Sequence, residues 1–303
     1  MELEKPKPVP SEKRPPEHLY QYTSIDGVEG IVGKRSLWAS QIHFLNDTQE
    51  FRYSVDILKR VLSERRKEYP ITRLRAIGTS PLPSEPEKLL ASFYNRLESI
   101  VLDDLFENIP IFIFSLSKRG DLLSQWRGYC PPGGGYSIGF RSELLIQFLK
   151  TRELYIEPCV YNEQEQESKV KQAVTEAGEV FSKNPTDHQE QFEKAAKEGL
   201  IHFFMDFYRI ASILKHPSFE EECEWRIISK PIPNKHLLFR VKKLILIPYF
   251  PISFEGIEPF PIDEIIVGPV QEQRLAEFSL KQFVLQTNLK ISIKTSTIPY
   301  REL

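Results

Sequence analysis

The sequence is poor in the residues that organise disulfide-rich and metal-binding proteins. Among 303 residues it has three cysteines and six histidines. The cysteines (Cys130, Cys159 and Cys223) are odd in number, widely spaced and outside any CxxC pattern, which argues against a disulfide framework or a cysteine zinc site. The histidines form no HxH or HxxxH pair. We therefore expect reduced thiols and no bound metal.

Long apolar runs and an excess of one charge are also lacking. The longest apolar runs, such as residues 244–250, are far shorter than a membrane-spanning helix, and the first 17 residues contain no apolar region typical of a signal peptide. The 40 basic and 42 acidic residues give a formal net charge of −2, so no overall basic field attracts the chain to nucleic acid or an anionic membrane. We expect a cytoplasmic protein without a membrane partner.

What the sequence contains is the composition of a globular protein, with 41% hydrophobic and 27% charged residues. Residues 1–16 include five prolines and predict a disordered tail. Residues 17–303 mix strand and helix patterns without regular βαβ alternation, which predicts a single α+β domain with a mixed, mainly antiparallel sheet. Helical insertions are expected at about 48–108 and 162–214.

One informative stretch is 111–140, IFIFSLSKRGDLLSQWRGYCPPGGGYSIGF. Its β-branched and aromatic start predicts a strand that carries Ser115 and Ser117 on one face. A short helical turn with Trp126 follows, and prolines with the run Gly133–Gly135 then predict a turn into a second strand. These residues would suit the wall of a site. A hairpin with a polar end and a buried tryptophan is the alternative.

A second informative stretch is 216–228, HPSFEEECEWRII. As a strand it would carry Glu222, Glu224 and Arg226 on one face and Trp225 on the other. Two carboxylates about 7 Å apart disfavour double ionisation, whereas the guanidinium favours it. Such a strand would hold one carboxylate ready for chemistry and a second as an acid or positioning group. A solvent-exposed charged face of an antiparallel strand is the alternative.

Other sequence signals are weaker. Asp47 and Glu50 fit a helix capping box, which explains them without a function and leaves Asn46 open. No GxSxG, P-loop or GxGxxG motif lies in the required context, which argues against hydrolase, NTPase and Rossmann dehydrogenase classes.

Several blocks, taken together, resemble a known family. LYQYTS, SLWAS…FLNDTQEF, FSLS…LLSQWRGY…GGGYSIGF, EEECEWRII and IDEIIVGP run in this order over most of residues 18–301. They resemble a bacterial family of unknown function, domain of unknown function family 2971. The resemblance brings no established activity.

The chain also resembles ADP-ribosyltransferases of the Arg-Ser-Glu type, which use a basic residue on a first strand, then a Ser-x-Ser strand end and a Glu-x-Glu strand. Ser115-Leu-Ser117 and Glu222-Cys-Glu224 match the second and third elements. The first strand differs from this pattern, because it has Tyr20 and Tyr22 in place of a basic residue, with His18 just before them. A His or Tyr can replace the arginine in that superfamily.

This resemblance implies NAD as a substrate and a role for each matching residue. Glu224 would stabilise the oxocarbenium-like charge on the ribose, and Glu222 would orient or deprotonate the acceptor. Ser115 and Ser117 would support Glu224 and the nicotinamide pocket, and the first-strand residues Tyr20 and Tyr22 would bind the cofactor. The fold expected is the core of an ADP-ribosyltransferase.

The residues themselves add two ligand contacts. Trp126 or Tyr129 would stack on a flat ring, and backbone amides of the glycine run, centred on Gly134, would approach a pyrophosphate. A glycine run without a following helix is a weak phosphate signal, and a flexible hairpin turn is the favoured explanation.

The function expected is therefore NAD-dependent transfer of ADP-ribose, or NAD hydrolysis, by an intracellular bacterial protein. A toxin or defence setting follows from analogy of fold alone, and the acceptor is not specified by the sequence. The alternative is a non-catalytic module that binds a nucleotide or a protein, in which Glu222, Glu224 and Arg226 form a structural row of ion pairs.

Overall fold

The computed structural model describes residues 15–45, 50–68, 85–102, 111–132, 134–183, 188–242 and 244–299. The chain forms two compact units. The first, here called the sheet unit, comprises segments 1–40, 112–159 and 221–303, and the second, the helical unit, comprises segments 41–111 and 160–220. The chain therefore leaves the sheet unit twice to build the helical unit.

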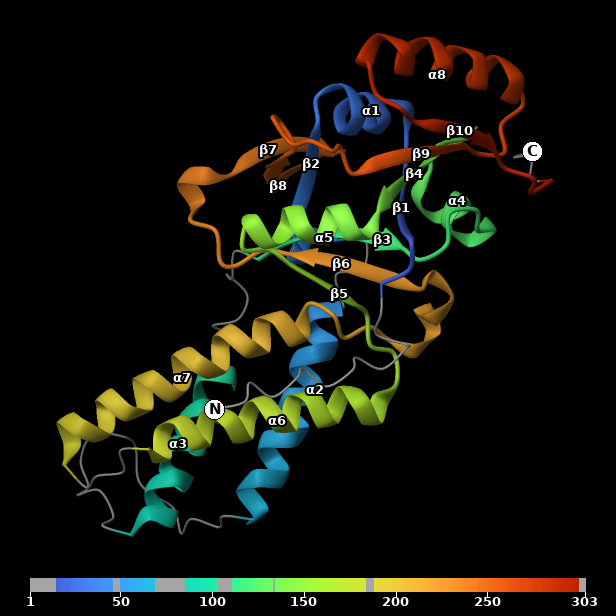
Figure 1. The fold of residues 1–303 in the computed structure, drawn as a ribbon. Coiled ribbons are helices and arrows are strands. Elements are labelled where there is room, and N and C mark those ends of the chain that lie inside the picture. The colour runs from blue at the N-terminus through green and yellow to red at the C-terminus, as the bar shows by residue number, and fades with distance from the viewer. Residues whose placement is uncertain are drawn as a thin grey trace, which may run out of the picture. The chain divides into compact units, whose positions relative to one another are not determined.

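Every strand of the described residues belongs to the sheet unit, apart from the last residue of β2. The strands are β1 (His18–Thr23), β2 (Ser36–Gln41), β3 (Phe112–Ser117), β4 (Tyr136–Arg141), β5 (Tyr155–Pro158), β6 (Glu224–Ile228), β7 (Leu238–Lys242), β8 (Ile245–Ser253), β9 (Ile262–Val267) and β10 (Ser292–Thr295). Their order is β10-β9-β4-β1-β3-β2-β8-β7, with β6 paired to β3 and β5 paired to β6 (Figure 1). Strands β9 and β10 pair in parallel, and the other pairs with a described register are antiparallel.

The register of β3 decides where the polar side chains lie. Ser115 is opposite Arg226 and Ser117 is opposite Glu224 on β6, while Tyr20 of β1 is the partner of Ser117 on the other side. Directly opposed residues of an antiparallel pair project to the same face. One face of the sheet therefore carries these polar groups.

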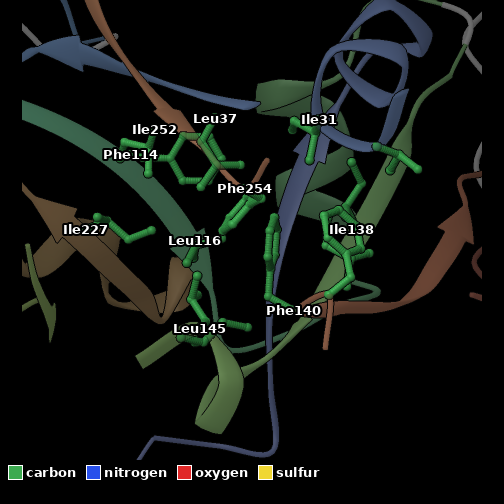
Figure 2. Packing of buried hydrophobic residues seen from close by; sticks show 14 of the residues in the cluster. Ile31, Leu37, Phe114, Leu116, Ile138, Phe140, Leu145, Ile227, Ile252 and Phe254 are labelled. Atoms are coloured by element: carbon green, nitrogen blue, oxygen red, sulfur yellow. The ribbon is translucent and has the colours of Figure 1, made fainter. Parts of the chain in front are cut away.

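The other face of β3 is part of a hydrophobic core. Phe114 and Leu116 alternate with the two serines and are buried. Figure 2 shows them gathered with Phe140 and Phe254 in one cluster. Burying each side chain of this size stabilises the fold by about 1.5–3 kcal/mol. The alternation along β3 thus separates a stabilising face from a polar one.

Short helical segments complete the sheet unit. They are α1 (Ile25–Val28), the π-helix η2 (Glu29–Gly33), α4 (Leu123–Tyr129), α5 (Ser142–Thr151), η6 (Asn234–His236) and α8 (Gln273–Thr287). The Ser24 side chain accepts a hydrogen bond from the Gly27 amide and so caps α1. Phe148 of α5 packs on Phe254 with ring centroids 4.6 Å apart, which fixes this helix on the core.

The helical unit is built from four long helices and the 3-10 helix η3 (Ile42–Phe44). The helices are α2 (Glu50–Glu68), α3 (Pro86–Leu102), α6 (Glu163–Ser182) and α7 (Gln189–Ala211). Their aromatic side chains form its interior, where the Phe93 and Phe181 rings stack at 4.9 Å and Phe192 meets Phe181 edge-on at 5.4 Å. Each of these helices has one apolar face, and it buries that face by packing against the apolar faces of its neighbours. The 3-10 helix η5 (Pro217–Glu222) begins in this unit and ends in the sheet unit.

The structure confirms the predicted fold class, because helices accompany a mixed, mostly antiparallel sheet. The two segments predicted as helical insertions supply α2, α3, α6 and α7, and the single domain itself stays a prediction. The tail prediction falls largely on residues 1–14, which lie outside the described residues, as do Asn46 and Asp47.

The predicted start of β6 was wrong, because the strand was expected to include Glu222. β6 begins at Glu224, and Glu222 is the last residue of the 3-10 helix η5. The reason lies in Cys223, whose φ of 46° is left-handed and breaks the extended conformation. Glu222 therefore does not lie on the strand face that carries Glu224 and Arg226.

Within the described residues, no helix is long and apolar enough to cross a membrane. In the same part of the chain, no three His, Cys, Asp or Glu residues gather as a metal site would require. Cys130, Cys159 and Cys223 are not joined in disulfide bonds.

Candidate functional site

A small pocket opens on the polar face of the sheet unit, where β1, β3 and β6 meet α4 and η5. It has a volume of about 30 Å³, room for one or two water molecules. Seven of the nine residues proposed from the sequence line it, together with Gln21, Leu116 and Gln125. The seven are Tyr20, Tyr22, Ser115, Ser117, Tyr129, Glu222 and Glu224. Their ligand-binding and catalytic roles stay predictions.

The charged centre of the pocket is the pair formed by Glu224 and Arg226. Both side chains are buried, with residue exposures of 6% and 1%. The Arg226 Nε donates to Glu224 Oε1 at 2.8 Å and its Nη2 donates to Oε2 at 3.1 Å. This two-point contact fixes the plane of the carboxylate and compensates its charge. Glu224 is therefore a rigid acceptor at the pocket wall.

Ser117 connects the end of β3 to the start of β6. Its Oγ donates to the Glu222 carbonyl oxygen at 2.8 Å and accepts from the Arg119 amide at 3.1 Å. Ser117 is buried, so these bonds satisfy its hydroxyl within the protein. It holds the residues that precede Glu224 in place, whereas Ser115, two residues earlier, also lines the pocket.

The rim is made by contacts between α4 and η5. The Tyr129 hydroxyl donates to the Glu222 carboxylate at 3.1 and 3.3 Å, and Ser124 Oγ donates to Glu221 at 3.2 Å. Tyr129 is 37% exposed, so this rim faces water. The cavity is smaller than an aromatic or sugar ring, and the contact between Tyr129 and Glu222 borders it.

Tyr22 and Trp126 anchor α4 against the sheet. The Tyr22 hydroxyl donates to the Arg119 carbonyl at 2.8 Å and accepts from the Leu122 amide at 2.9 Å. Its ring meets Trp126 edge-on at 4.7 Å. Burial raises the pKa of the Tyr22 phenol. Tyr22 thus has a supporting role at the pocket wall.

Trp126 is not among the residues that line the pocket, and its stacking on a ligand ring stays a prediction. Its indole is buried at 3% exposure, and Nε1 donates to Asp121 Oδ1 at 2.8 Å. The same Asp121 oxygen accepts from Ser296 Oγ at 2.7 Å. Trp126 therefore joins a small hydrogen-bonded cluster behind the pocket, and Tyr129 is the aromatic residue at its rim.

Gly134 also lies outside the pocket. Its φ of 129° is reached by glycine and strained for other residues, and an added Cβ would lie 2.8 Å from Val270 Cβ. The tight turn between α4 and β4 therefore requires a residue without a side chain at this position. Gly133 lies outside the described residues.

Tyr20 joins the pocket to a second carboxylate. Its hydroxyl donates to Glu264 Oε1 at 3.1 Å, and Glu264 Oε2 forms an ion pair with Lys294. Burial, followed by the charge and hydrogen bond of Glu264, raises the pKa of Tyr20. Tyr20 is therefore a neutral phenol at physiological pH.

Sequence reasoning missed Gln125 and Glu264. Gln125 of α4 is buried at 6% exposure and lines the pocket. It directly precedes Trp126, the residue of this helix that the sequence analysis selected. Glu264 lies in the strand IDEIIVGP, where a charged residue in an apolar run was the available signal. Its Cα partner on β4 is Gly139, which in turn pairs with Tyr20, and that pairing is invisible in the sequence.

Comparison with known proteins gives one match. Residues 125–227 match the model of a family described as a protein of unknown function, DUF2971, which confirms the resemblance predicted from the sequence. The matched segment runs from Gln125 on α4 to Ile227 on β6, and so includes Tyr129, Glu222 and Glu224 of the pocket. Neither curated proteins nor solved structures give a match.

Proposed function

We propose that the sheet unit binds NAD at this pocket and catalyses ADP-ribosyl transfer or NAD hydrolysis. The observation that supports it is the meeting of three distant segments. Tyr20 on β1, Ser117 on β3 and Glu224 on β6 are neighbours in register, in the chain order that the resemblance to ADP-ribosyltransferases implies.

In this proposal, Glu224 faces the ribose and stabilises positive charge as the bond to nicotinamide breaks. Arg226 keeps the carboxylate in one orientation, so that no reorganisation is needed during the reaction. Glu222 lies at the rim with Tyr129 and orients or deprotonates the acceptor. Ser115 contacts the ligand, and Ser117 keeps the β3–β6 junction in place.

The narrow cavity requires the rim to open before a ring can enter. The opening contact is the hydrogen bond between Tyr129 and Glu222, which is partly exposed and so contributes little to stability. Closing on the bound ring would exclude water from the reacting carbon. An intracellular setting in a bacterium is part of the proposal, because the three cysteines form no disulfide bond.

The test is to incubate the protein with millimolar NAD and to measure nicotinamide release and ADP-ribosylated products. Glu224→Gln should reduce release at least a hundredfold. Glu143→Gln is the control, because Glu143 of α5 is an exposed carboxylate that does not line the pocket. Since a change at Glu224 also affects a buried ion pair, Ser115→Ala serves as a second pocket variant, and melting temperatures report folding. Release by Glu224→Gln equal to that of the parent protein contradicts the proposal.

A second candidate is a non-catalytic binding module. The observation that favours it is the two-point pairing of Glu224 with Arg226, because a charge-compensated buried pair can be purely structural. A protein that shows no nicotinamide release, but whose melting temperature rises with ADP-ribose or another nucleotide, would support this candidate.

A further inference from the structure

The hairpin of β7 and β8 ends in a tip, residues 241–246, whose described side chains are apolar and exposed. Val241, Ile245 and Leu246 are 76%, 57% and 61% exposed, and Leu244 at the turn is fully exposed. Burial begins one residue further along β8, where Ile247 is 4% exposed. Because a strand rises about 3.3 Å per residue, the tip projects about 10 Å beyond the packed part of the hairpin.

The apolar side chains of the tip lie on both faces of the hairpin. Val241 and Leu246 are opposed in register, so they project to one face. Ile245, the neighbour of Leu246 along β8, projects to the other face, and Leu244 lies between the two strands at the turn. A protein that packs on one face of a sheet would cover only one of these sets. A partner that buries all four side chains has to surround the tip.

This end of the sheet also lacks acidic residues. β2, β8 and β7 are consecutive in the strand order, and none of the three contains Asp or Glu. Arg240 donates to Ser40 Oγ at 2.8 Å, and no carboxylate among the described residues forms an ion pair with it. Residues 231–254 contain no acidic residue and four lysine or arginine residues, which are Lys235, Arg240, Lys242 and Lys243. The charge of this segment therefore favours an anionic partner.

A second copy of the chain does not complement these features. β7 is the edge strand, and pairing it with β7 of another copy would bring together two strands that carry basic and no acidic residues. Like charges opposed across a strand pair are destabilising, and lysine on an edge strand is a common protection against such pairing. Leu244 lies at the turn, outside the strand, so it would stay exposed in that dimer.

An anionic lipid surface complements both the charge and the shape of the tip. Lipid phosphates attract lysine and arginine side chains, and the boundary between headgroups and acyl chains surrounds an inserted element on all sides. Amphipathic elements bury their apolar side chains about 5–10 Å into that boundary. The projection of the tip is of the same length.

We propose that the tip of the β7–β8 hairpin is a docking site for an anionic lipid surface. Val241, Leu244, Ile245 and Leu246 insert into the lipid, and basic residues of the same segment, Arg240 among them, meet the headgroup phosphates. The expectation of no membrane partner rested on the net charge of the whole chain and on the length of its apolar runs, and neither quantity describes this local segment. The docking depends neither on the pocket nor on NAD.

The first experiment is sedimentation of the full chain with vesicles of phosphatidylcholine, alone or with phosphatidylglycerol as about a third of the lipid. The protein should bind the anionic vesicles at least tenfold more tightly than the neutral ones. Binding should weaken with salt, because the Debye length shortens from about 30 Å at 0.01 M to about 3 Å at 1 M. Lys242→Gln should weaken binding about fivefold, and Leu244→Asn with Leu246→Asn at least tenfold.

Leu275→Asn is the matched control. Leu275 is 63% exposed, close to the value for Leu246, and its helix α8 packs against β9 and β10 at the other end of the strand order. This variant should bind the vesicles as the parent protein does, and melting temperatures report the folding of each variant. Absence of binding by the parent protein, equal binding to neutral vesicles, or undiminished binding by the double asparagine variant overturns the inference.

A second experiment measures insertion without relying on a loss of binding. Tryptophan placed at the tip by Leu244→Trp should be quenched by vesicles whose acyl chains carry bromine, whereas Leu275→Trp should be quenched no more than the parent protein. Equal quenching of the two variants overturns the inference. Light scattering tests the other occupant, because a dimer that dissociates in the double asparagine variant would assign the tip to a second copy and overturn the docking to lipid.

Discussion

At the scale of single residues, the polar face of the sheet carries carboxylates that are each paired with a basic side chain. Glu224 with Arg226, and Glu264 with Lys294, place two carboxylates on one sheet face without leaving a buried charge alone. The more buried pair is the first, at 6% and 1% exposure. Breaking such a pair leaves an uncompensated charge in the protein interior, which costs more than the pair itself contributes.

We therefore expect Glu224→Gln to lower the free energy of unfolding by about 3–5 kcal/mol, because Arg226 stays charged and buried. Replacing both residues, as in Glu224→Leu with Arg226→Met, should recover most of that loss. Chemical denaturation of the two variants measures the difference. A double variant less stable than Glu224→Gln would mean that the pair stabilises the fold beyond charge compensation.

The neighbouring residue gives a contrasting expectation. Trp225 lies on the opposite face of β6, within the core cluster and 6% exposed. Trp225→Ala should cost about 3–5 kcal/mol through the cavity it creates. The stability lost in Glu224→Gln should return when the partner charge is also removed. The stability lost in Trp225→Ala should not return when a charge is removed. Denaturation of Trp225→Ala, alone and combined with Glu224→Leu and Arg226→Met together, tests this separation of the two faces, and a combined variant as stable as the one that retains Trp225 contradicts it.

At the scale of elements, α4 is the part of the site most able to move. Exposed side-chain contacts, among them Tyr129 with Glu222 and Ser124 with Glu221, join it to η5. On its inner side, Tyr22 and Trp126 hold it to the sheet through a buried contact. The outer contacts can therefore open while the inner ones remain.

Removing the outer contact should loosen the helix without unfolding the protein. Tyr129→Phe deletes the bond to Glu222 and should change the free energy of unfolding by less than about 1 kcal/mol. Amide hydrogen exchange of residues 123–129 should nonetheless become faster, because local opening no longer breaks that bond. Tyr136→Phe, away from the rim, should leave this exchange unchanged. Unaltered exchange in Tyr129→Phe would show that the rim is held by other contacts.

The elements also show how far sequence reasoning reaches. Alternation along Phe112–Ser117 correctly assigned Phe114 and Leu116 to the core and the two serines to the other face, because period two is a local property. The same alternation gave the wrong face for Glu222. The positive φ of Cys223 ends the extended conformation there, and a cysteine in the sequence does not indicate a positive φ. Trp126 was expected at a ligand, but its partner Asp121 and the Ser296 that completes the cluster come together only through the sheet order. Glu264 was missed for the same reason.

At the scale of the whole molecule, half-buried and buried phenols link the stability of both units to alkaline pH. Burial raises the pKa of five tyrosines, three in the sheet unit and two in the helical unit. They are Tyr20, Tyr22, Tyr136, Tyr53 and Tyr208. Burial also raises the pKa of Cys130, to about 11.

Each of these groups keeps its proton in the folded chain at a pH where the unfolded chain has lost it. The unfolded state then binds fewer protons, so the free energy of unfolding falls as pH rises. The fall should begin near pH 9 for Cys130, end for that thiol near pH 11, and steepen above about pH 10 as the tyrosines contribute. Each fully buried group contributes up to about 1.4 kcal/mol per pH unit. Melting temperatures from pH 7 to 11 measure the effect, and Cys130→Ser should flatten the onset between pH 9 and 10 while leaving the steeper part unchanged. A melting temperature independent of pH up to 11 would mean that these groups ionise in the folded protein as they do in water.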